Sequence, residues 1–98
     1  MKFYHATDKK NLGPILIDGI KPGIDGYVYL CKTAVDALKF MLVRCVQDII
    51  VFEVSLKESE VEETFDHSEA FFKCKAYGAT KTIKSNKIIN VYDYSIKE

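Results

Sequence analysis

The chain has 98 residues, of which 48% are hydrophobic and 29% charged, enough for one small domain spanning residues 1–98 with a single core. Its 14 basic and 14 acidic residues give a formal net charge of zero, which argues against nonspecific electrostatic binding to nucleic acids or membranes. Arg44 is the only arginine, so an arginine cluster for bidentate phosphate recognition is excluded.

The cysteines indicate a reducing compartment. Cys31, Cys45 and Cys74 are odd in number and widely spaced, which fits neither a disulfide framework nor a metal site, so we expect small buried thiols. No charged-then-apolar leader opens the chain, and no apolar run approaches the length that spans a bilayer. We therefore expect a cytoplasmic protein without membrane association.

The first third of the chain predicts two strands with a helix between them. Residues 2–6 are β-prone, and Thr7 or Asp8 is a suitable N-cap for a helix over residues 8–18. Gly19 is placed to end that helix. The glycines and proline of residues 20–26 predict a turn-rich connection, which leads into a second strand at residues 27–31.

The middle of the chain predicts a longer helix followed by a central strand. Thr33 and Asp36 resemble a capping box at the start of a helix over residues 33–46. Apolar residues recur there at helical spacing and are expected to face the core: Ala34, Ala37, Leu38, Met41, Leu42 and Cys45. The β-branched run at residues 49–54 predicts a strand that is buried on both faces at its start.

Charge is segregated in the last half of the chain. Seven acidic residues lie between positions 53 and 69 against one lysine, and four of them are interpreted as a solvated acidic loop: Glu58, Glu60, Glu62 and Glu63. Residues 74–82 and 88–94 are candidate closing strands. Together the elements predict an α+β fold, with two main helices on a small split, mostly antiparallel sheet.

Common catalytic and metal-binding patterns are absent from the sequence. His5 and His67 have no carboxylate partners at a familiar metal-ligand spacing, and no thiol-enzyme signature surrounds Cys31 or Cys74. The five glycines are scattered, which excludes a phosphate-cradling glycine loop. Three polar segments remain that the elements could arrange around one groove: residues 4–7, 27–31 and 64–69.

The first two of these segments resemble a known enzyme superfamily. The opening strand contains Tyr4-His5-Ala6-Thr7, and the second strand contains Tyr27-Val28-Tyr29-Leu30 and is followed by an alanine-containing helix. In order and spacing, roughly the first 55 residues resemble the ADP-ribosyltransferase superfamily, in particular its small rifampin-modifying and RNA 2′-phosphotransferase-like branches. The resemblance implies an ADP-ribosyltransferase-like fold that uses NAD as co-substrate.

The resemblance also implies roles for individual residues. His5 matches the histidine that hydrogen-bonds the ribose of NAD, and Thr7 adjoins it. Tyr29 matches the residue that stacks on nicotinamide, and Tyr27 is the alternative because strand alternation places it on the same side. The acidic residue of the family corresponds to Glu69 or Asp66, with Glu69 preferred. The chain lacks the family's glutamate-x-glutamate signature, so this choice stays open.

The implied activity is NAD-dependent ADP-ribosyl transfer to an unidentified acceptor, which is a small molecule, a protein or a nucleic acid. Breaking the nicotinamide–ribose bond generates a cation, which an acidic group near residues 66–69 would stabilise. One alternative is a noncatalytic descendant that acts as a binding or inhibitory module. A second, RNA 2′-phosphotransferase-like activity, is disfavoured because Arg44 is the only arginine available for a substrate phosphate.

Overall fold

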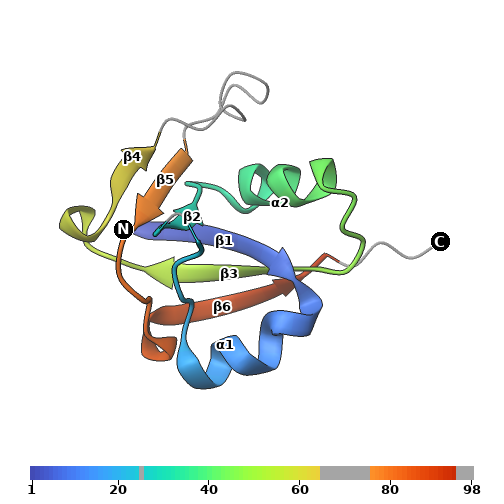
Figure 1. Ribbon diagram of the computed structural model, residues 1–98, viewed down its shortest axis with the longest axis horizontal. Coiled ribbons are helices and arrows are strands. Elements are labelled where there is room, and N and C mark those ends of the chain that lie inside the picture. The colour runs from blue at the N-terminus through green and yellow to red at the C-terminus, as the bar shows by residue number, and fades with distance from the viewer. Residues whose placement is uncertain (25, 65–75, 95–98) are drawn as a thin grey trace.

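A computed structural model describes residues 1–24, 26–64 and 76–94. Within these ranges the chain forms two three-stranded antiparallel sheets and two α-helices, which confirms the predicted α+β class (Figure 1). None of the helices in the described part of the chain is long and apolar enough to cross a membrane.

The first sheet has the strand order β1-β3-β6 and contains β1 (Lys2–Asp8), β3 (Ile49–Ser55) and β6 (Ile88–Asp93). β3 lies in the middle, and every side chain from Ile49 to Val54 is buried. This confirms the central strand that the β-branched run predicts. Apolar side chains occupy both faces of β3 because each face of the sheet is covered by another layer.

The second sheet has the order β2-β5-β4 and contains β2 (Val28–Leu30), β5 (Ala76–Ala79) and β4 (Glu62–Thr64). The interpretation of Glu62 and Glu63 as part of a loop is therefore wrong. Their side chains are exposed, as the charge pattern indicates, but their backbone pairs with β5. A short charged strand is typical of a sheet edge, where it discourages pairing with another chain.

The predicted cap of the second helix is confirmed, whereas the predicted cap of the first helix begins a 3-10 turn and the α-helix itself starts later, at Leu12. Asp8 accepts a hydrogen bond from the Lys10 amide at 3.0 Å and caps the 3-10 turn η1 (Lys9–Asn11), which continues into α1 (Leu12–Asp18). Thr33 accepts from the Asp36 amide at 3.1 Å and caps α2 (Ala34–Val43). α2 ends three residues before the predicted end, at position 46, because Arg44 leaves the helical conformation and Cys45 has a φ of 59°. Cys45 is exposed, so the expectation of a buried thiol is wrong there.

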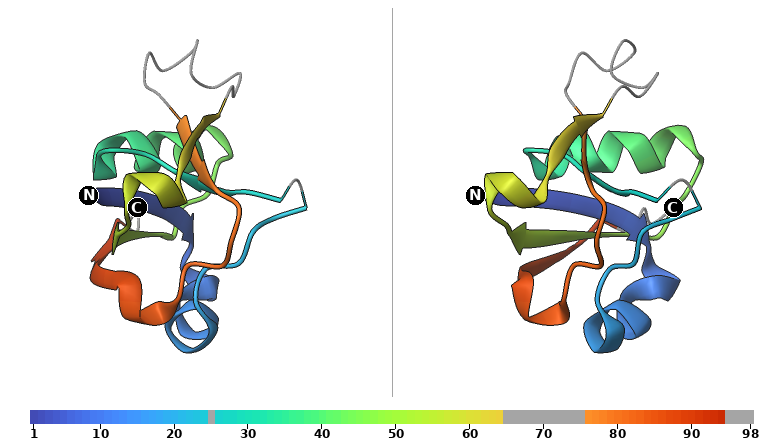
Figure 2. Two further views of the ribbon diagram at one scale, coloured as in Figure 1. Left: turned by 90° about the vertical axis from the view of Figure 1, so that its left-hand side faces the viewer. Right: turned by 60° about the vertical axis from the view of Figure 1, so that its left-hand side comes forward.

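The first sheet separates two clusters of buried side chains. α2 covers one face of the sheet, as the two turned views of Figure 2 show. The side chains packed on this face include Cys31, Ala37 and Val51. The other face packs against α1 and the second sheet through residues such as Phe3, Leu30 and Phe52. The two sheets meet where Tyr4 and Cys31 exchange backbone hydrogen bonds of 2.8 and 2.9 Å.

Gly19 connects α1 to the C-terminal half of the chain. Its amide donates to the Ile15 carbonyl and ends the helix, and the next residue, Ile20, forms an isolated antiparallel bridge with Ile83. Gly19 has φ 83° and ψ −178°, a conformation that is almost restricted to glycine. The backbone of Ile83 lies against the side on which any other residue would carry its Cβ.

Candidate functional site

The candidate site lies where β1 and β2 part. Tyr4 of β1 forms an isolated bridge with Cys31, the residue that follows β2, and the next residue of β1, His5, extends its side chain toward β2. Its Nδ1 lies 2.8 Å from the carbonyl oxygen of Tyr29. At this position the side chain of His5, rather than its backbone, forms the hydrogen bond to β2. That hydrogen bond fixes the orientation of the imidazole ring.

This hydrogen bond determines the tautomer of His5. A carbonyl oxygen only accepts, so Nδ1 must carry the proton that it donates to Tyr29. Burial lowers the pKa of His5, and the Tyr29 carbonyl opposes that change to a smaller extent. The ring is therefore neutral near pH 7, and Nε2 presents a lone pair. His5 can accept a hydrogen bond from a ligand hydroxyl through Nε2.

A cavity of about 90 Å³ adjoins both His5 and Tyr29. This space holds several water molecules or one small ring. Its lining is mostly apolar and aromatic, with Arg44 as its one charged side chain apart from the titratable His5: Tyr4, His5, Ala6, Tyr29, Leu30, Cys31, Ala37, Phe40, Met41 and Arg44. None of these residues is an aspartate or a glutamate. Among the described residues, this cavity therefore contains no group to stabilise a cation by negative charge.

A second cavity of about 280 Å³ lies on another side of His5. Thr7 lines it, and the Thr7 hydroxyl accepts a hydrogen bond of 2.9 Å from the side-chain amide of Asn11. Asp18 and Lys21 contribute one charge of each sign to the lining. Among the residues that the structure describes, His5 is the one that lines both cavities.

The two tyrosines of the second predicted strand lie on one side of β2, as alternation requires. Their ring centroids are 6.1 Å apart with an angle of 36° between the planes. Tyr29 is 39% exposed and lines the small cavity, whereas Tyr27 is half-buried and lines neither cavity. The structure thus brings His5 and Tyr29 together at one cavity and His5 and Thr7 at the other.

The predicted acidic residues, Asp66 and Glu69, lie outside the described residues, and so do His67 and Cys74. In the described ranges no group of three or more histidine, cysteine or acidic side chains is arranged to hold a metal ion. The described part of the site consists of a hydrogen-bond acceptor, an aromatic face, the cations Arg44 and Lys21, and the carboxylate of Asp18 in the second cavity.

Sequence reasoning missed two residues near this site. Arg44 was placed on the apolar helix, but it follows the last helical residue and reaches the cavity of His5 and Tyr29. Glu53 was counted with the acidic segment, yet its exposure is only 4%. An acidic residue between apolar neighbours in a central strand is a signal of burial, and it distinguishes Glu53 from the acidic residues that follow it.

Glu53 is held by the two strands that flank β3. Its Oε1 accepts from the Tyr4 hydroxyl at 2.7 Å, and its Oε2 accepts from the Asn90 amide at 2.7 Å. These hydrogen bonds, with that of Asn90 first, lower the pKa of Glu53, and the carboxylate in turn raises the pKa of Tyr4 to about 12. Tyr4 also lines the cavity next to His5. Glu53 therefore holds the side chain of one lining residue in place through its hydrogen bond to the Tyr4 hydroxyl.

The lowered pKa of Glu53 predicts a pH-dependent contribution to stability. A carboxyl group whose pKa is lower in the folded state stabilises the fold above its ordinary pKa of 4.5, and that contribution disappears as the pH falls through the lowered value. Glu53→Gln should therefore lower the thermal midpoint at pH 7 by about 5 °C or more, and the difference from the parent should narrow at pH 3.

Circular-dichroism melts at the two pH values measure this effect, and Glu58→Gln, at an exposed position, is the matched control. A destabilisation by Glu53→Gln that is the same at pH 7 and pH 3 would show that the ionised carboxylate is unimportant.

No model of a known protein family matches this chain, and no curated protein matches it. The assignment of function therefore depends on the residues and geometry described above.

Proposed function

We propose that this protein binds NAD at His5 and Tyr29 and transfers the ADP-ribosyl group of NAD to an acceptor. The observation that carries the proposal is the hydrogen bond between His5 Nδ1 and the Tyr29 carbonyl, which fixes an acceptor nitrogen beside an aromatic cavity. The resemblance of the two strand segments to the ADP-ribosyltransferase superfamily supports the same assignment.

Each residue has a specific task in this proposal. Nε2 of His5 accepts a hydrogen bond from a hydroxyl of the nicotinamide ribose, and the ring of Tyr29 stacks on nicotinamide in the small cavity. The rest of the dinucleotide extends along the cavity of Thr7 and Asn11, where Lys21 is the cation available to the pyrophosphate. Tyr27 supports the Tyr29 ring through the contact between the two rings.

In the transfer, the bond between ribose C1′ and the nicotinamide nitrogen breaks, and its electron pair leaves with nicotinamide. A nucleophile on the acceptor forms the new bond to C1′ and loses a proton. The ribose is cationic near the transition state, so a carboxylate close to it lowers the barrier. We assign that role to Glu69, with Asp66 as the alternative.

One observation favours a second function. The cavity of His5 and Tyr29 has no carboxylate among its described lining residues, and it contains the positive charge of Arg44, which opposes a developing cation. A noncatalytic module that binds NAD or a related nucleotide needs only the acceptor nitrogen, the aromatic face and the cations. Measurement of nicotinamide release from bound NAD distinguishes an enzyme from such a module.

Two substitutions at Tyr29 test the stacking contact. Tyr29→Ala should weaken NAD binding by about 1 to 3 kcal/mol, roughly 5- to 150-fold, because it removes the aromatic face. Tyr29→Phe should retain most of the affinity, since the ring remains. Isothermal titration calorimetry measures both values. Equal losses in the two variants would assign the contact to the hydroxyl group and contradict stacking.

A further inference from the structure

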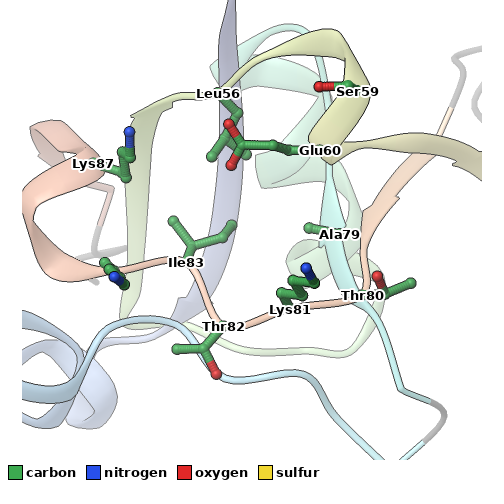
Figure 3. Close-up of a pocket in the computed structure, with 10 residues that line it drawn as sticks. Leu56, Ser59, Glu60, Ala79, Thr80, Lys81, Thr82, Ile83 and Lys87 are labelled. Atoms are coloured by element: carbon green, nitrogen blue, oxygen red, sulfur yellow. The ribbon is translucent and has the colours of Figure 1, made fainter.

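A cavity apart from the candidate NAD site is lined by a different set of residues. It has a volume of about 530 Å³ and shares no lining residue with the cavities next to His5. It lies between the short helix η2 (Glu58–Glu60) and the segment that leads from β5 to η3 (Ser85–Lys87), as Figure 3 shows. Its lining consists of Leu56, Ser59, Glu60, Ala79, Thr80, Lys81, Thr82, Ile83, Lys84 and Lys87.

The lining is positively charged. Lys81, Lys84 and Lys87 face one acidic residue, Glu60, and neither of the salt bridges found among the described residues involves these lysines. Figure 3 shows Lys81 and Lys87 on the two sides of Ile83. Three ammonium groups around one hollow create a local positive potential in a chain whose formal net charge is zero.

The floor of the cavity is apolar and firmly packed. Leu56, Ala79 and Ile83 are 4%, 3% and 3% exposed, and the backbone of Ile83 is held by its bridge to Ile20. Hydroxyl groups of Ser59, Thr80 and Thr82 add hydrogen-bond donors to the lining. A pocket with an apolar floor, a few polar groups and this volume is typical of a small-molecule site.

The absence of aromatic side chains from this lining helps to identify the ligand. Proteins that bind single-stranded nucleic acids stack successive bases on aromatic rings along a basic groove. Here the lysines line one partly open hollow, and they bind phosphate as point charges because no arginine fork is present. The chemistry favours a compact anion with several phosphate charges over a nucleic-acid strand.

We propose that this cavity, which we call the lysine cavity, binds the phosphate groups of a small phosphorylated molecule. Lys81, Lys84 and Lys87 attract the phosphates, and Thr80 and Thr82 donate hydrogen bonds to them. Glu60 limits the affinity by charge repulsion. Its Oε1 accepts from the Lys57 amide at 3.2 Å, so the carboxylate is tethered at the cavity.

The test is a titration of the full chain with inorganic pyrophosphate at constant ionic strength. Binding is detected by the chemical-shift changes of backbone amides in NMR spectra. Amides of residues 79–87 are expected to shift most. Combined substitution of Lys81, Lys84 and Lys87 by glutamine should weaken binding at least about tenfold, because three attractive charges are lost. The matched control replaces Lys10, Lys32 and Lys39, which lie outside the cavity, by glutamine. It should change the affinity for pyrophosphate less than about threefold.

Glu60→Gln is the sharper variant because a gain of affinity cannot result from misfolding. The glutamine oxygen still accepts from Lys57, while the repulsive charge is removed, so pyrophosphate should bind about two- to fivefold more tightly. The proposal is overturned if Glu60→Gln leaves affinity unchanged or if both lysine triples weaken binding equally. It is also overturned if a ten-nucleotide single-stranded DNA binds more tightly than pyrophosphate. Pyrophosphate bound beside Lys21 would instead shift amides near residues 18–21 and would not respond to Glu60→Gln, so failure of this proposal is distinguishable from failure of the proposed ADP-ribosyl transfer.

Discussion

Gly19→Ala is expected to destabilise the protein by about 3 to 5 kcal/mol, a large part of the stability of a small domain. Alanine rarely adopts φ 83° with ψ −178°, and its Cβ would collide with the carbonyl oxygen of Ile83. That oxygen cannot move away freely, since it accepts the Ile20 amide at 2.8 Å. Urea unfolding followed by circular dichroism measures the loss.

Two other glycines provide matched controls. Outside its chain neighbours, a Cβ at Gly13 meets nothing within 4 Å, and the helix propensity that alanine adds is offset by the Pro14 ring, which disfavours the helical conformation of a preceding residue with a Cβ, so Gly13→Ala should change stability by less than about 1 kcal/mol. Gly26 also has a positive φ, of 84°, but its surroundings are open, so Gly26→Ala should cost about 1 kcal/mol through backbone strain alone. Equal effects of Gly19→Ala and Gly26→Ala would show that the contact with Ile83 is unimportant.

Glu69→Gln is expected to reduce ADP-ribosyl transfer, or slow NAD hydrolysis, by about a hundredfold while leaving NAD affinity within about twofold. A carboxylate that stabilises a cation present only near the transition state lowers the barrier without strengthening binding in the ground state. Release of nicotinamide at saturating NAD measures turnover, and calorimetry measures affinity.

Asp66→Asn is the matched control for this experiment. If Asp66→Asn shows the loss of turnover and Glu69→Gln does not, the acidic role belongs to Asp66. If the parent and both variants release no nicotinamide although NAD binds, the protein is a noncatalytic binding module.

The parts of the fold that were predictable are those determined by local sequence. The cap at Thr33 depends on a hydrogen bond to Asp36, three residues away, and the β-branched run from Ile49 favours a buried strand because such side chains pack well on a sheet. Strand β4 was missed because its pairing with β5 depends on backbone hydrogen bonds between segments separated in sequence. The exposed, acidic side chains of Glu62 and Glu63 give no sign of that pairing.

The candidate site was predictable only in its residue types. Tyr4-His5 and Tyr29 stood out as polar and aromatic side chains on apolar strands, but the contact between His5 and the Tyr29 carbonyl depends on how the strands diverge. The lysine cavity was not predictable, since Leu56, Glu60 and Lys87 come together only through the tertiary fold. The positions of these residues along the sequence do not indicate that they line one cavity.

The most direct test of the proposed function is a calorimetric titration with NAD of the parent, of His5→Ala and of Lys10→Ala, an exposed control outside the cavities. We predict that NAD binds the parent and the control alike, and that His5→Ala weakens binding at least tenfold through loss of about 1.4 kcal/mol or more. Affinity of the parent should also fall as the pH drops below 6.5 and through the lowered pKa of His5, because protonation of Nε2 removes the acceptor. Equal NAD affinity in His5→Ala and the parent, or no NAD binding by the folded parent, would contradict the proposal.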